Sequence, residues 1–123
     1  MNAKFLGSFG LVSAYDLCGI SYTFSVEMFN IEKSLWENKA DYPFCDVMLD
    51  DYSSVSINDF VLIIGGQCKK SVGTETAREV HSIIVKFQNN LWTQVGNLMI
   101  PRRYHRSIVM NDRVYVVGGS GTL

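Results

Sequence analysis

The chain contains few cysteines and prolines, no long apolar run and no excess of either charge. Of its 123 residues, three are cysteine and two are proline. Eleven Lys and Arg stand against twelve Asp and Glu, so the net charge is -1 and no positive field exists to attract nucleic acid or an anionic membrane. The longest apolar run, 60–64, is far shorter than the roughly 20 residues of a membrane-spanning helix. We therefore expect no nucleic-acid or membrane partner, and the hydrophobic fraction of 47% excludes a disordered chain.

The cysteines indicate free thiols. Cys18, Cys45 and Cys68 form an odd, widely spaced set without a C-x-x-C pair, which favours neither a disulfide framework nor a zinc site. We expect reduced, partly buried thiols in a cytoplasmic protein. His81 and His105 are too scattered to complete a ligand set, so no metal or other cofactor is expected.

The start of the chain is a weak candidate for a signal peptide. Its apolar stretch, 5–12, contains two glycines and a serine, and a single lysine precedes it. A signal peptide has a more continuous apolar segment after a more strongly charged start. A glycine-containing strand is the better interpretation of this stretch.

Two segments repeat at a fixed offset. Residues 53–66 and 106–119 align without a gap at an offset of 53 (106 − 53), and each contains an apolar strand, an Asn-Asp pair, a second apolar strand and a Gly-Gly pair. Asn and Asp tolerate the positive φ of a tight hairpin turn, and glycine leaves a strand through conformations closed to residues with a Cβ. Each segment is therefore predicted to be a β-hairpin.

A second repeat contains the two tryptophans. An extended segment ending in Phe29 leads through a turn to Trp36, and another ending in Phe87 leads through a shorter turn to Trp92. Their strand patterns predict two further hairpins. No segment has a convincing helical period, and the residues 71–82, which contain glycine and threonines, favour a solvated loop over a single helical turn.

A unit of four short antiparallel strands that repeats after about 50 residues is typical of a β-propeller blade. The sequence here resembles the kelch repeat family, whose pattern is strand, turn, strand, Gly-Gly, a variable loop, and an aromatic residue before a turn and a Trp. The resemblance covers about 22–119, with the best match from Leu91-Trp92 to Gly118-Gly119 and another at 29–36, where Phe29 stands in the place usually held by Tyr. One departure is Asp50-Asp51-Tyr52, where the later unit has Arg103-Tyr104-His105.

The resemblance implies an all-β fold, a partial kelch-type β-propeller made of four-stranded antiparallel blades, one full and two partial. The expected units are a degenerate or truncated blade start at 1–21, a partial kelch blade at 22–52, a complete kelch repeat at 53–95, and the first hairpin of a further, truncated repeat at 96–123. Propellers close with typically four to eight blades. The chain therefore needs further blades or self-association to close a ring.

The candidate structural residues are the repeated ones: Gly65, Gly66, Trp36, Trp92, Gly118 and Gly119. Because the tryptophans recur at equivalent positions, we expect both to pack between blades and not to serve as ligand platforms. The glycine pairs are expected to be turns, since no phosphate-binding pattern follows them. The acidic residues Asp46, Asp50 and Asp51 match no calcium loop and are expected in a solvated loop.

One locally basic cluster lies at 102–106. The kelch resemblance implies that an arginine here braces neighbouring backbone. The alternative places Arg103 and Tyr104 on the propeller face as partner-binding residues, which recognise an acidic peptide through charge-assisted hydrogen bonds.

We expect a non-catalytic protein–protein interaction module that binds a protein partner through loops of the propeller, at 40–51, 67–80 and 96–104. The kelch resemblance implies, more specifically, the substrate-recognition part of a cullin-type ubiquitin ligase adaptor. The alternatives are an actin-binding kelch protein, or a truncated product with no independent activity. A fragment of a propeller enzyme is a third class, for which this sequence supplies no metal-ligand set.

Overall fold

The computed structural model describes residues 26–122, which form strands and turns without a helix. The expected unit at 1–21 and Cys18 lie outside the described residues. In chain order the strands are β1 Val26–Asn30, β2 Leu35–Lys39, β3 Met48–Asp50, β4 Ser53–Ile57, β5 Phe60–Ile64, β6 Gln67–Val72, β7 Glu75–Val80, β8 Ile83–Gln88, β9 Leu91–Asn97, β10 Arg106–Met110 and β11 Arg113–Val117.

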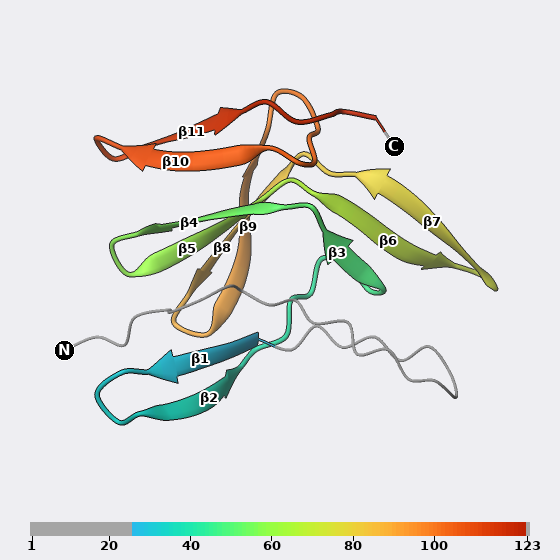
Figure 1. Ribbon diagram of the computed structural model, residues 1–123. Helices are drawn as coiled ribbons and strands as arrows, with labels where there is room; N and C mark the ends of the chain where they lie inside the picture. The colour runs from blue at the N-terminus through green and yellow to red at the C-terminus, as the bar shows by residue number, and fades with distance from the viewer. Residues whose placement is uncertain (1–25, 123) are drawn as a thin grey trace.

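The central element is a four-stranded antiparallel sheet in the order β4-β5-β8-β9. Two separate hairpins, β1–β2 and β10–β11, lie on opposite sides of it, with β10 against β4 (Figure 1). The all-β, blade-like fold is therefore as predicted, and the four-stranded sheet spans the segment in which a complete repeat is expected. The division of the whole chain into repeats stays a prediction.

The hairpin turns form where the sequence places Asn and Asp. Asn58 has a φ of 52° between β4 and β5, and Asn111 and Asp112 have φ of 53° and 58° between β10 and β11. Asn89 and Asn90 do the same between β8 and β9, with φ of 53° and 58°. Short polar side chains tolerate this left-handed region of the backbone. The strand pairing separately confirms all four predicted hairpins.

A three-stranded sheet, in the order β3-β6-β7, lies beside the four-stranded one (Figure 1). The prediction of a solvated loop at 71–82 is wrong, because most of this segment belongs to the β6–β7 hairpin. Gly73, with a φ of 63°, supplies the turn, and β-branched Val72, Thr76 and Val80 suit the strands. The hairpin is nevertheless exposed to solvent over residues 71–79.

The core lies on one face of the central sheet. Val61 and Ile63 of β5 pair with Phe87 and Val85 of β8, and all four side chains are buried. Successive residues of a strand point to opposite faces, so the i, i+2 spacing places these four together. Burying each contributes about 2 kcal/mol. Tyr42 and Cys45 from the segment before β3, and Leu49 from β3 itself, are buried in the same cluster.

Candidate interaction face

Gly65 and Gly66 form the junction between the central sheet and the β10–β11 unit. A Cβ on Gly65 would lie 2.7 Å from the Arg102 carbonyl oxygen, and one on Gly66 would lie 2.8 Å from the Asp50 carbonyl oxygen. The Gly66 amide donates to the Arg102 oxygen over 2.8 Å. Both glycines have positive φ, so this close approach of backbones excludes any side chain.

The second glycine pair repeats this geometry only in part. A Cβ on Gly119 would lie 2.5 Å from the Arg103 carbonyl oxygen, which matches the contact between Gly66 and Asp50 at the offset of 53. A Cβ on Gly118 would meet nothing within 4 Å, although its equivalent, Gly65, is enclosed. The contact of the second glycine with an earlier carbonyl oxygen of its own unit therefore occurs in both units. The contact of the first glycine with a following unit occurs only at Gly65 in the described chain.

The two tryptophans differ in burial, and packing between blades stays a prediction for Trp36. Trp92 is 8% exposed, its Nε1 donates to the Ala40 carbonyl oxygen over 2.8 Å, and its ring lies against Tyr42 with centroids 5.1 Å apart. Ala40 and Tyr42 belong to the segment that follows β2, the last strand of the preceding unit. Trp36 is 64% exposed, and no preceding unit covers it among the described residues. Its ring lies tilted against that of Phe29, with centroids 5.1 Å apart.

Arg103 braces neighbouring parts of the chain, as the kelch resemblance implies, and it also contacts an exposed tyrosine. Its Nε donates to the Thr122 carbonyl oxygen over 3.1 Å, and its guanidinium donates to the Gln67 side-chain oxygen. The same guanidinium lies 4.8 Å from the centroid of the Tyr104 ring, which is a cation–π arrangement. Tyr104 is 61% exposed, so this pair braces the fold from one side and reaches solvent on the other.

Two further basic residues, which the sequence did not single out, share the face of Arg103. Lys69 of β6 and Arg78 of β7 are directly opposite each other in the ladder. Gln67 is two residues from Lys69 and therefore points to the same side of the sheet, where it accepts from Arg103. We call Lys69, Arg78, Arg103 and Tyr104 the interaction face. Lys69 and Arg78 could have been identified only by predicting that β6 and β7 pair, and the interpretation of this segment as a loop excluded such pairing.

The positive charge of this face is only partly compensated. No ion pair within 4.0 Å involves Lys69, Arg78 or Arg103 among residues 26–122. Asp50, opposite Gln67 in the β3–β6 ladder, is an acid near this face, and Arg78 and Arg103 act electrostatically to lower the pKa of its carboxyl. Burial of the Asp50 carboxyl raises its pKa, the charge of Asp51 raises it further, and these two effects outweigh the lowering by the arginines. The Asp50 Oδ1 atom is buried without a hydrogen bond. The expectation of a solvated loop is thus wrong for Asp50, which is a strand residue.

Two buried histidines connect this region to the core. The His105 Nε2 lies 2.8 Å from the Ile64 carbonyl oxygen, which can only accept, so Nε2 carries the proton. The Nδ1 atoms of His105 and His81 are buried without a partner. Burial lowers the pKa of both imidazoles, so both are neutral near pH 7.

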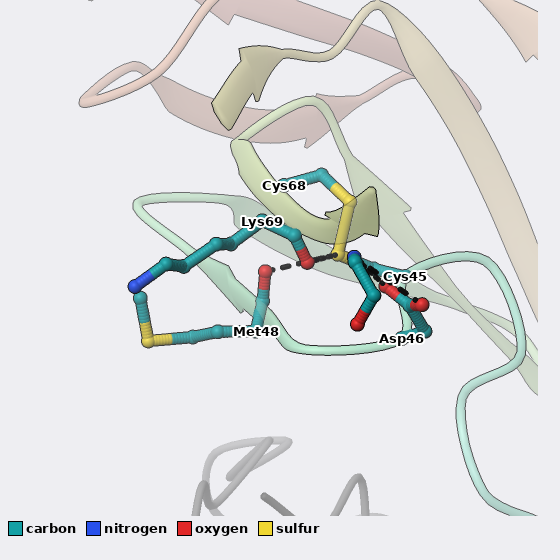
Figure 2. Close-up of a disulfide and its surroundings, with 6 residues drawn as sticks. Cys45, Asp46, Met48, Cys68 and Lys69 are labelled. Carbon is teal, nitrogen blue, oxygen red and sulfur yellow. Dashed lines mark hydrogen bonds between the residues drawn. A yellow bond between two sulfur atoms is a disulfide. The ribbon is translucent and has the colours of Figure 1, made fainter. Parts of the chain in front are cut away.

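Cys45 and Cys68 form a disulfide, which overturns the prediction that these thiols are reduced. Their Cα atoms are 5.9 Å apart, and both side chains are buried (Figure 2). The Cys45 sulfur also lies 2.9 Å from the Met48 carbonyl oxygen (Figure 2). Sequence spacing missed the pair because the fold, through the β3–β6 ladder, brings together residues 23 positions apart.

Neither a cluster of metal ligands nor a membrane-spanning helix is present in residues 26–122. No group of three or more His, Cys, Asp or Glu side chains among them is arranged to hold a metal ion. Within the same part of the chain, no helix is long and apolar enough to cross a membrane.

The fold therefore defines a protein of the β-propeller class, in which a four-stranded antiparallel sheet is flanked by two separate hairpins. Beta-scruin of Limulus polyphemus is 26% identical over 113 residues, which are 89% of this chain and 12% of that protein. Kelch-like protein 21 of Rattus norvegicus is 25% identical over 100 residues, which are 80% of this chain and 15% of that protein. This chain thus spans less than a sixth of these curated relatives.

A solved structure, that of YjhT, has the same fold. Its TM-score is 0.65 at 20% identity, and the match covers 78% of this chain and 28% of the other. No protein-family profile matches the chain. The repeated Gly-Gly and Trp units, the four-stranded blade and these similarities support the resemblance of this chain to the kelch-repeat family.

Proposed function

We propose that this chain is a non-catalytic protein-interaction module, which binds an acidic segment of a partner protein at the interaction face. Similarity to kelch-repeat proteins supports the interaction role in general. The observation that carries the finer proposal is the placement of Lys69 directly opposite Arg78, with Arg103 on the same side of the sheet. Among residues 26–122, no carboxylate lies within 4.0 Å of any of the three.

Charge and exposure explain why a partner of this chemistry suits the face. Two like charges directly opposite each other in a ladder destabilise the sheet, and an anion placed between them removes that cost. Arg103 offers charge-assisted hydrogen bonds to a carboxylate, and the exposed ring of Tyr104 supplies apolar contact area beside it.

The experiment measures the fluorescence anisotropy of a labelled deca-glutamate peptide with the whole chain. Arg78→Glu is expected to weaken binding at least tenfold, since it places a negative charge opposite Lys69. Arg113→Glu, at the distant tip of β10–β11, makes the same change in net charge and is the matched control. An equal loss of peptide affinity in the two variants would show a non-specific effect of net charge, and the interaction face would be rejected as the binding site.

Among the roles implied by the kelch resemblance, we favour substrate recognition in a cullin-type ubiquitin ligase adaptor, and actin binding is the alternative. Capture of a cullin by the full-length protein supports the first role. Co-sedimentation of that protein with actin filaments, lost in the Arg78→Glu variant, supports the second. A cytoplasmic location stays a proposal for either role, and the Cys45–Cys68 disulfide argues against it, because the thiol pool of the cytoplasm keeps most cysteines reduced.

A further inference from the structure

The Cys45–Cys68 disulfide joins two of the segments that we expect to contact a partner. Cys45 lies in the irregular segment between β2 and β3, and Cys68 lies in β6, one residue before Lys69. The bond therefore ties the 40–51 segment to the strand that presents one of the basic residues of the interaction face (Figure 2).

Few other interactions hold these two segments together. The β3–β6 ladder contains the three pairs Met48↔Lys69, Leu49↔Cys68 and Asp50↔Gln67. Beyond the ladder, the Val47 amide donates to the Lys69 carbonyl oxygen over 3.1 Å, and the Ser71 amide donates to the Asp46 carboxylate over 3.1 Å. From residue 71 to residue 79 the hairpin is exposed, so it contributes little buried apolar surface of its own.

We propose that the Cys45–Cys68 disulfide is a redox-controlled clamp that keeps the β6–β7 hairpin, and with it the interaction face, ordered. The effect of the clamp on partner binding rests on the proposed function, whereas its effect on the order of the hairpin does not. The ladder that joins the hairpin to the 40–51 segment has only three pairs, so this contact is expected to open locally, and a covalent bond beside it suppresses that opening.

The reductive step uses a dithiol. One thiolate of the dithiol attacks a protein sulfur, which breaks the protein S–S bond and forms a mixed disulfide. The second thiol then displaces the remaining protein sulfur, so the dithiol becomes a disulfide and the protein gains two electrons and two protons as two thiols. The reduced Cys45 thiol can donate to the Met48 carbonyl oxygen 2.9 Å away, so the buried site accepts the thiol as well.

Burial of both sulfurs determines when reduction occurs. A thiolate reaches them only while the β3–β6 contact is open, so the clamp responds to a sustained reducing environment.

The experiment follows amide hydrogen exchange of the whole chain by mass spectrometry. Cys18→Ser leaves only the Cys45–Cys68 pair, and labelling times are kept short enough that β5 and β8 remain protected. Dithiothreitol is expected to speed exchange in 67–80 at least tenfold and to leave β5 and β8 unchanged. The Cys45→Ser/Cys68→Ser variant should behave like the reduced protein without any reductant.

Unchanged exchange in 67–80 on reduction, or three titratable thiols in the oxidised wild-type protein, would overturn the inference. Loss of protection in β5 and β8 at the same labelling times would also overturn it, since the bond would then support the whole fold. Anisotropy of the deca-glutamate peptide with the oxidised protein tests the binding proposal separately. Absent binding together with a redox-dependent hairpin rejects the proposed function and retains the clamp.

Discussion

At the scale of single residues, Trp92 and Trp36 occupy equivalent places but have different surroundings. Trp92→Ala is expected to cost about 3–5 kcal/mol of unfolding free energy, because it removes a buried ring and leaves the Ala40 carbonyl oxygen without its donor. Trp36→Ala, at an exposed site, is expected to cost less than about 1 kcal/mol. Urea unfolding followed by circular dichroism measures both, and equal costs would contradict the difference in burial.

Gly65 and Gly118 form a matched pair for testing contact between units. Both have positive φ, 62° and 74°, so alanine should cost roughly 1–2 kcal/mol at either position from backbone strain alone. Gly65→Ala adds a clash with the Arg102 carbonyl oxygen, so its cost should be clearly larger. Thermal unfolding of the two variants gives the comparison, and a larger effect at Gly118 would show that its open surroundings are misassigned.

The buried histidines predict a loss of stability in mild acid. The unfolded chain takes up protons as pH falls through about 6.5, whereas burial keeps His105 and His81 neutral in the fold until lower pH. The stabilising contribution of these neutral imidazoles is therefore complete above about pH 6.5 and is lost progressively as the pH falls below it. Asp50, whose pKa is raised from 3.8, acts in the opposite direction at more acidic pH.

The measurement is urea unfolding between pH 7 and pH 5. His105→Gln, whose amide can still donate to the Ile64 carbonyl oxygen, should make the dependence on pH shallower. A wild-type protein whose stability is the same at both pH values would contradict the role of these imidazoles.

At the scale of elements, the β6–β7 hairpin separates binding from stability. Replacing residues 70–77 by Asn-Gly joins Lys69 directly to Arg78, which are already a register pair, through a turn suited to a two-residue hairpin. Because the removed residues are almost wholly exposed, the unfolding free energy should change by less than about 1 kcal/mol. Urea unfolding monitored by Trp92 fluorescence tests this, and loss of a cooperative transition would mean that the hairpin supports the core.

At the scale of the whole molecule, the β10–β11 hairpin presents an uncovered apolar face. Ile108, Met110, Tyr115 and Val117 are all exposed, and the ladder places them on one side. The equivalent positions on β4 and β5 include buried Val55 and Ile64, against which the β10–β11 unit packs. This face is therefore suited to another unit of the same kind, from further blades or from a second copy.

The isolated chain is consequently expected to self-associate as its concentration rises. Ile108→Lys should shift the mass measured by light scattering toward the monomer, while Ser56→Lys, an exposed polar site on β4, should not. A chain that is monomeric at all concentrations and lacks a cooperative unfolding transition would instead favour a truncated product without independent activity.

Local sequence signals were sufficient for the four hairpins but not for the β6–β7 segment. The Asn-Asp and Asn-Asn turns fix the register of adjacent strands, so their consequences are local. Residues 67–80 pair partly with β3, which lies about 20 residues earlier, and the polar composition of the segment hides that partner. Arg103 and Tyr104 stood out as a basic cluster, whereas Lys69 and Arg78 become neighbours only through the ladder.

The sequence by itself determined the repeat, the turn positions and the all-β blade, because strand alternation and turn chemistry act between residues close along the chain. The tertiary structure decided which repeated residues are enclosed. Trp92 and Gly65 are covered by neighbouring units, whereas Trp36 and Gly118 have the same local sequence context and no covering unit among the described residues. It also decided the disulfide and the basic face, since both depend on strands that meet in space and that no local pattern connects.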